Sequence, residues 1–154
     1  MAVPVNAGSK PVIPLRRLGE SDLFEGMLEG ESEPYAYDLA ITWGTGEQWR
    51  TRDPFSFLPT ISENDLYLFG CGEERAIYEK LGSHPRTIDG VQGTSFAVWA
   101  PNAHRVSVVG DFNGWDARHH PMRMLGQSGV WELFVPGCGV GSHYKFQIIT
   151  PDGE

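Results

Sequence analysis

The chain has 154 residues and a formal net charge of −8, and 40% of its residues are hydrophobic. This length allows one or two small domains, and the negative charge argues against binding to a nucleic-acid backbone, which needs a basic surface. No apolar run approaches the roughly 20 residues that a membrane span requires, and the first residues lack the apolar segment of a secretory signal.

Glycine and proline are frequent, with 19 and 11 residues, so we expect many turns, as in an all-β protein. The two cysteines, Cys71 and Cys138, lie in separate halves of the chain and at no spacing typical of a metal site. We therefore expect two free thiols in a reducing compartment, and a cytoplasmic location.

The beginning of the chain predicts little regular structure. Residues 1–14 contain three prolines, so we expect extended or poorly ordered chain there. Residues 15–18 and 23–28 are predicted to be short strands that flank a turn at residues 19–22.

The clearest strand of the first half covers residues 35–43. Its side chains alternate strictly, which predicts a strand with one face on a core, and that face carries Tyr35, Tyr37, Leu39, Ile41 and Trp43. A turn at residues 44–46 and a return strand at residues 47–52 would complete a hairpin.

A short helical segment is predicted next. Ser62 is a candidate N-cap for a helix over residues 63–69 that stops at Gly70. Residues 73–81 could form a second short helix that stops at Gly82, followed by a turn at Asp89-Gly90.

The second half again predicts strands. Residues 95–100 and 105–110 both alternate, and Pro101 and Asn102 favour a turn between them, so we expect these two strands to form a hairpin. Further strands are expected at residues 130–135 and 144–149.

Several runs of the second half resemble the family-48 carbohydrate-binding module, a β-sandwich that binds starch and glycogen. These runs are FAVWAP at residues 96–101, DFNGW at 111–115 and YKF at 144–146. The preceding run YEKLGSHP at residues 78–85 is similar to the entry into this module in bacterial 1,4-α-glucan (glycogen) branching enzymes.

The resemblance implies an all-β fold with two consecutive immunoglobulin-like β-sandwich modules joined by a short helical connector. The first module would be partial and cover residues 1–60, and the connector residues 61–90. The family-48 module would cover residues 91–154 and lack its C-terminal strand or strands. Two incomplete sandwiches would expose strand edges, so we also expect a homodimer or strand exchange.

Catalytic groups are not expected in this chain. Branching enzymes resemble the α-amylase family, whose members act through a (β/α)₈ barrel of roughly 250 residues. None of the carboxylate motifs of that barrel occurs here. The chain would instead be the non-catalytic part of an enzyme that transfers α-1,4-glucan segments to form α-1,6 branches. Its partners would be α-1,4-glucans, such as glycogen or maltooligosaccharides, and the catalytic barrel, with no cofactor.

The resemblance places a sugar site at Trp115 and Lys145, with Asn113 close enough in sequence to add a hydrogen bond. Trp115 could instead pack on the sandwich edge, over Pro121 and Met122. The mid-strand tryptophans are expected in core or inter-domain packing; they are Trp43, Trp99 and Trp131. The histidines around residues 119–120 have no spacing that indicates a metal site.

Three readings of the function stay open. A glucan-binding module requires Trp115 and Lys145 to be exposed, whereas a purely structural scaffold predicts a buried Trp115. A free-standing regulatory glycogen-binding subunit is disfavoured because residues 15–59 resemble the later part of the first module of branching enzymes, and because of the run at residues 78–85. A module of a related debranching enzyme also remains open, because only the barrel sequence would decide it.

Overall fold

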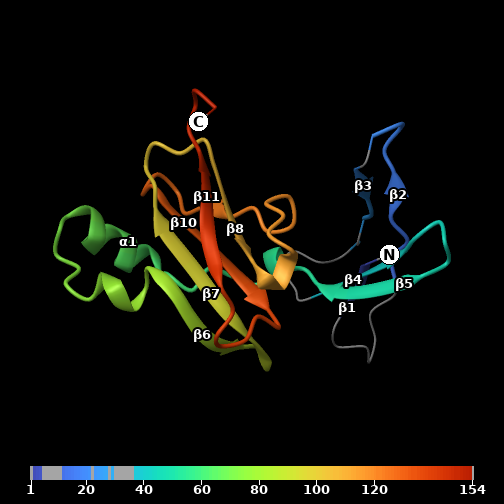
Figure 1. Ribbon diagram of the computed structural model, residues 1–154, viewed down its shortest axis with the longest axis horizontal. Helices are drawn as coiled ribbons and strands as arrows, with labels where there is room; N and C mark the ends of the chain where they lie inside the picture. The colour runs from blue at the N-terminus through green and yellow to red at the C-terminus, as the bar shows by residue number, and fades with distance from the viewer. Residues whose placement is uncertain (1, 5–11, 22, 28, 30–36, 154) are drawn as a thin grey trace. The chain divides into compact units, whose positions relative to one another are not determined.

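A computed structural model describes the following residues of the chain: 2–4, 12–21, 23–27, 29 and 37–153. The chain divides into two compact units, Met1–Phe57 and Leu58–Glu154 (Figure 1). Each unit is built mainly from antiparallel strands, so the prediction of an all-β chain is confirmed.

The first unit contains a three-stranded sheet with the order β1-β4-β5. These strands are β1 (Ala2–Pro4), β4 (Tyr37–Thr42) and β5 (Gln48–Arg52). A tight turn joins β4 to β5, with Trp43 N–H donating to the Glu47 carbonyl at 2.9 Å, so the predicted hairpin is confirmed. Residues 35 and 36 of the predicted strand lie outside the described residues.

A second, two-stranded sheet of the first unit joins β2 (Arg16–Arg17) to β3 (Phe24–Glu25). Both predicted strands are therefore confirmed, although each is shorter than expected, and residues 22 and 28 lie outside the described residues. The sequence did not distinguish β1 from irregular chain, because three residues are too few to show a period.

The second unit is a sandwich of two sheets. The larger has the order β6-β7-β10-β9, and β11 pairs with β8 in the smaller. The larger sheet contains β6 (Gly82–Ile88), β7 (Val91–Trp99), β9 (Arg123–Met124) and β10 (Val130–Pro136). The smaller contains β8 (Arg105–Gly110) and β11 (Tyr144–Ile149), which lie in front of the larger sheet in Figure 1.

The core of the sandwich lies between these sheets. Phe96 and Leu133 from the larger sheet pack with Val106 and Val108 from the smaller one, and all four are at most 1% exposed. Alternate residues of the strands therefore face this core.

The predicted hairpin of residues 95–110 is wrong, because β7 and β8 belong to different sheets. The turn that follows β7 crosses between the sheets. At its ends, Ala100 N–H donates to the Gly129 carbonyl and His104 N–H donates to the Ile149 carbonyl. Alternation is the same for a hairpin and for such a crossing, so the pattern could not separate them.

The helix α1 (Glu63–Gly70) confirms the first helical prediction. Ser62 and Asp65 form a reciprocal capping box at its start, which satisfies two otherwise free amides. At its end, Gly70 is still helical. The helix therefore ends one residue later than predicted, and the left-handed residue expected at Gly70 is Gly72, at φ +74°.

The second predicted helix, residues 73–81, is wrong. Only one 3₁₀ turn forms there, η2 (Ile77–Glu79), and Gly82 begins strand β6 instead of ending a helix. The amides of Glu73 and Glu74 both donate to the Leu68 carbonyl, so this backbone closes α1 rather than starting a new helix. None of the described helices is long and apolar enough to cross a membrane.

The helical segment packs against the outer face of the larger sheet. Ile61, Leu66 and Phe69 contact a buried cluster that contains Ala97 and Val130. The buried Glu132 carboxylate anchors the same segment, because it accepts hydrogen bonds from the Thr60 amide at 2.6 Å and hydroxyl at 2.5 Å. Residues expected to form a separate connector are thus part of the second unit.

The tryptophans divide into two groups. Trp131 is buried and donates its indole N–H to the Ala100 carbonyl, which confirms its core position. Trp43 and Trp99 are 55% and 54% exposed, so core burial is wrong for both of them. The two cysteines are free thiols, as expected.

Candidate functional site

The loop that follows β8 is tightly folded. Residues Asp111–Asn113 form the 3₁₀ helix η3, and Trp115 N–H returns to donate to the Gly110 carbonyl at 3.0 Å. Gly114 and Trp115 both have φ +63°. Glycine adopts this left-handed backbone freely, but a tryptophan there costs on the order of 1–3 kcal/mol, and such strain is concentrated at functional sites.

Asn113 holds this loop together from inside. It is 8% exposed, its Oδ1 accepts from Gly110 N–H, and its Nδ2 donates to the Val108 carbonyl, both at 2.9 Å. The same Nδ2 lies 2.9 Å from His120 Nδ1. The prediction of Asn113 as a sugar contact is therefore corrected, because both ends of its amide are already engaged.

His120 is the neutral partner of this amide. Burial, and then the nearby His119, lower the pKa of His120 to about 4, so its Nδ1 accepts from Asn113 near neutral pH. A half-buried imidazole that stays uncharged completes the hydrogen bonding of the loop without placing a charge beside the core.

Aromatic rings of the sandwich core pack against the loop. Phe112 stacks on Phe96 with ring centroids 5.6 Å apart, and Phe96 meets Tyr144 at 4.9 Å. Phe112 also meets the edge of His120 at 5.6 Å. These contacts tie the loop to both sheets, so Trp115 projects from a rigid base.

The Trp115 ring is 46% exposed, and its indole Nε1 donates to Asp111 Oδ1 at 3.2 Å. A half-exposed ring with one edge hydrogen-bonded offers a fixed apolar surface to solvent. Exposure is what the glucan-binding reading requires, whereas the scaffold reading required a buried ring.

Lys145 lies on β11, at the end of the smaller sheet where the Trp115 loop begins. Its neighbour Tyr144 is the register partner of Gly110, the residue to which the Trp115 amide returns. Lys145 is exposed, while Tyr144 and Phe146 pack against the core. Within the described part of the chain, its ammonium has no hydrogen bond or ion pair and is free to donate.

Asp111 and His143 complete this end of the sheet, and the sequence did not point to either. Asp111 Oδ2 accepts from His143 N–H and from His143 Nδ1, both at 3.0 Å. These bonds, together with that of Trp115, lower the pKa of Asp111 below its ordinary value. The only signal in the sequence is an acidic residue four positions before the exposed tryptophan.

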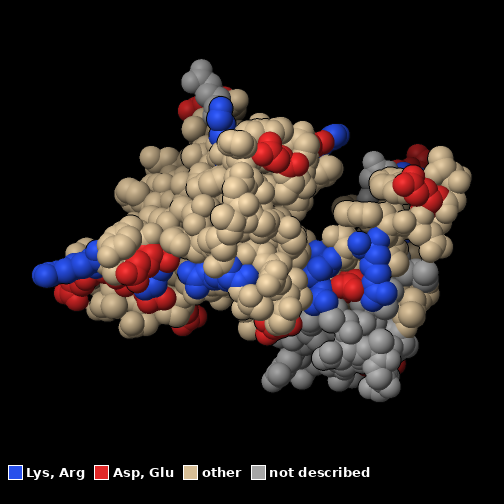
Figure 2. Space-filling view, turned by 60° about the horizontal axis from the view of Figure 1, so that its bottom comes forward, with Lys and Arg blue, Asp and Glu red and all other residues tan. Residues whose placement is uncertain are grey.

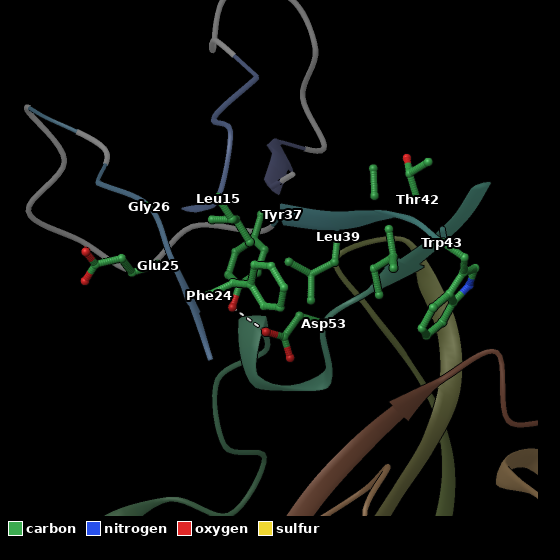
Figure 3. Close-up of a pocket in the computed structure, with 11 residues that line it drawn as sticks. Leu15, Phe24, Glu25, Gly26, Tyr37, Leu39, Thr42, Trp43 and Asp53 are labelled. Carbon is green, nitrogen blue, oxygen red and sulfur yellow. Dashed lines mark hydrogen bonds between the residues drawn. The ribbon is translucent and has the colours of Figure 1, made fainter. Parts of the chain in front are cut away.

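A cavity of about 970 Å³ lies in the first unit (Figure 3). Aliphatic and aromatic side chains line it, among them Leu15, Phe24, Leu39 and Trp43. The Tyr37 hydroxyl donates a hydrogen bond to the Asp53 carboxylate, so these two polar groups of the lining are paired with each other. Its lining is mainly apolar.

Surface charge and metal-binding groups add two observations. A broad area of the second unit carries neither acidic nor basic side chains on the face shown in Figure 2. Across the described residues, no group of three or more His, Cys, Asp or Glu side chains could hold a metal ion.

Both the second unit and the whole chain are similar to known proteins. Residues 80–154 match the family "Carbohydrate-binding module 48 (Isoamylase N-terminal domain)". The chain is 50% identical over 147 residues to "1,4-alpha-glucan branching enzyme GlgB" of Cereibacter sphaeroides, and 49% identical over 150 residues to that of Rubrobacter xylanophilus. These alignments cover 96% and 97% of the chain but 20% of each relative, so the chain spans about a fifth of their length.

Proposed function

We propose that the second unit binds α-1,4-glucan chains. The proposal rests on two matches: residues 80–154 match the carbohydrate-binding module 48 family, and the chain matches the N-terminal region of 1,4-α-glucan branching enzymes. Trp115 and Lys145 are the contact residues of this proposal. The observation that carries it is the exposed Trp115 ring, held on a rigid loop at the end of the smaller sheet that also carries Lys145.

The chemistry of the two side chains suits a neutral sugar polymer. One face of a glucose ring is made of C–H groups and packs on an aromatic ring, whose large flat surface loses little conformational freedom on binding. An ammonium group adds up to three hydrogen bonds to hydroxyl or ring oxygens. Neither interaction requires the ligand to carry a charge.

The wider role follows from the relatives. We propose that this region belongs to an enzyme that moves α-1,4-glucan segments to form α-1,6 branches, and that it acts in the cytoplasm beside a catalytic barrel. A tethered site of this kind raises the local concentration of the glucan, so weak affinity is sufficient. The same proposal includes a homodimer, since β11 pairs with β8 alone among the described strands and leaves an open edge.

Maltoheptaose titration tests the binding proposal. Tryptophan fluorescence and backbone amide shifts are followed in the wild-type chain and in Trp115→Ala, and we expect affinity to fall by about tenfold or more when the ring is removed. Trp99→Ala is the matched control, because Trp99 is also about half exposed in the same unit but packs against Phe69 of α1 instead of belonging to the η3 loop. Its affinity should stay within about twofold of wild type.

Two outcomes would decide against the proposal. No response at millimolar maltoheptaose would leave the unit a structural scaffold, as the alternative reading holds. Equal losses in the Trp115 and Trp99 variants would place the glucan elsewhere on the unit. Light scattering that gives a monomer at high protein concentration would separately remove the homodimer.

A further inference from the structure

Asp111 receives three hydrogen bonds that converge from two different parts of the second unit. One comes from the Trp115 indole at 3.2 Å, and two come from the backbone and ring of His143, each at 3.0 Å. His143 lies immediately before β11, the strand that carries Lys145. A single carboxylate therefore connects the loop of Trp115 to the strand of Lys145.

We propose that Asp111 is a positioning residue for glucan binding, which fixes the orientation of the Trp115 ring relative to Lys145. This inference rests on the proposed function. The inference goes beyond the proposed function because it assigns a role to Asp111, a residue that needs no contact with the sugar.

The backbone alone does not determine where the Trp115 ring points. The left-handed conformation and the bond to Gly110 fix the Cα atom, but two side-chain torsions remain free at an exposed position. The bond from the indole to Asp111 removes that freedom before any ligand arrives. Pre-organisation of this kind strengthens binding by reducing the ordering that binding would otherwise require.

Asp111 is itself well fixed. It begins η3 directly after β8, and its own amide donates to the His143 carbonyl at 3.2 Å. Both carboxylate oxygens are engaged, Oδ1 with the indole and Oδ2 with His143. Because the Asp111 carboxylate is fixed by His143, it can in turn fix the orientation of the Trp115 ring. A freely rotating surface aspartate could not do this.

The test uses the whole chain and two substitutions at this position. Asp111→Ala removes the acceptor, and Asp111→Asn leaves one acceptor oxygen in place of two, so the side chain can no longer receive both the indole and the His143 amide. Asp116→Ala is the matched control, because Asp116 lies in the same loop but pairs with Arg118. It removes the same charge and leaves the indole bond in place.

Two readouts are recorded for each variant. The first is the indole N–H resonance of Trp115 without sugar, assigned with Trp115→Phe, and the indole resonance of Trp131 serves as the internal reference. The second is the dissociation constant for maltoheptaose. We expect the Trp115 resonance to move and exchange faster with water in both Asp111 variants, and the affinity of each to fall about fivefold.

The outcomes separate this inference from the proposed function. If wild type binds and both Asp111 variants bind equally well, or if Asp116→Ala loses as much affinity, the inference is wrong. If wild type does not bind, the proposed function fails, and the indole resonance alone decides the positioning role: a shift supports it and an unchanged resonance overturns it. Thermal unfolding of each variant shows that the fold is retained, which is expected since Asp111 is half exposed.

Discussion

The two units of the chain bury their side chains to very different extents, although both consist of antiparallel strands. In the second unit, Val106, Val108 and Leu133 are completely shielded from solvent. In the first unit, Phe57 is the only buried residue among those described, and Phe24 and Trp43 are more than half exposed beside a cavity of about 970 Å³.

This difference separates the formation of a strand from the formation of a core. Strand β4 has as regular an alternation as any strand in the chain, yet its side chains are only partly buried. Apolar burial contributes about 25 cal/mol per Å², so a strand stabilises a fold only when a second layer covers its inner face. In the second unit two sheets and α1 supply those layers.

The largest expected effect is the loss of a core leucine from the second unit. Leu133→Ala should lower the free energy of unfolding by about 2–5 kcal/mol, because it leaves a cavity between the two sheets. The same substitution at Leu39, on β4 of the first unit, should cost about 1 kcal/mol or less, because that side chain is only partly buried. Urea denaturation followed by residue-resolved amide signals measures both.

Equal losses at Leu133 and Leu39 would contradict the comparison. They would mean that the first unit has a core as well covered as the second. Separate transitions of the two sets of amide signals are expected, with the first unit unfolding at lower urea.

The strands could be predicted from the sequence, but their partners could not. Alternation identified β4, β10 and β11 because each strand exposes one face to a different environment. The pairing of β7 with β10 joins residues far apart in the chain, as in the register of Leu133 with Phe96. No local pattern reports such pairing, which explains why the hairpin of β7 with β8 was predicted wrongly.

The candidate site shows the same limit at the level of side chains. The motif identified Trp115 and Lys145, and both are exposed as glucan binding requires. Its polar residue Asn113 points inward, because the 3₁₀ turn directs that side chain to Gly110 and Val108. The bond between Asp111 and His143 spans 32 positions, so it appears only in the folded chain.

A pH dependence should also distinguish the second unit. The folded state lowers the pKa of His120 from 6.5 to about 4, so between these values the unfolded chain binds a proton that the folded chain does not. The contribution of His120 to stability is therefore complete above pH 6.5 and is lost as the pH falls toward 4. We expect a loss of about 1–2 kcal/mol, after allowing for solvent screening of a partly exposed ring.

His120→Gln should remove this part of the pH dependence, and denaturant unfolding between pH 4 and pH 7 measures it. His104→Gln is the control, because His104 is an exposed histidine of the same unit. A wild-type curve that runs parallel to that of His120→Gln would contradict the prediction.

A smaller effect is expected at the start of α1. Ser62→Ala removes the hydroxyl that accepts from the Asp65 amide at 3.2 Å and should cost about 1 kcal/mol. Because Leu66 and Phe69 of this helix pack against the outer face of the larger sheet, the loss should extend to global unfolding of the second unit. Hydrogen exchange of the α1 amides measures the effect, and Ser62→Thr, which keeps a hydroxyl, should restore most of the stability. Faster exchange confined to α1 would show that the helix contributes little to the core.

The smallest effect is expected at Trp43, and it tests whether exposure alone makes a sugar site. Trp43 and Trp115 are exposed to similar extents, at 55% and 46%, but of these two residues only Trp115 donates a hydrogen bond from its indole within the described structure. Trp43 also lies beside aliphatic side chains. Trp43→Ala should therefore change the dissociation constant for maltoheptaose by less than about twofold, against about tenfold or more for Trp115→Ala. A comparable loss in both variants would mean that the cavity of the first unit also holds glucan, and that a fixed ring orientation is not what distinguishes the site on the second unit.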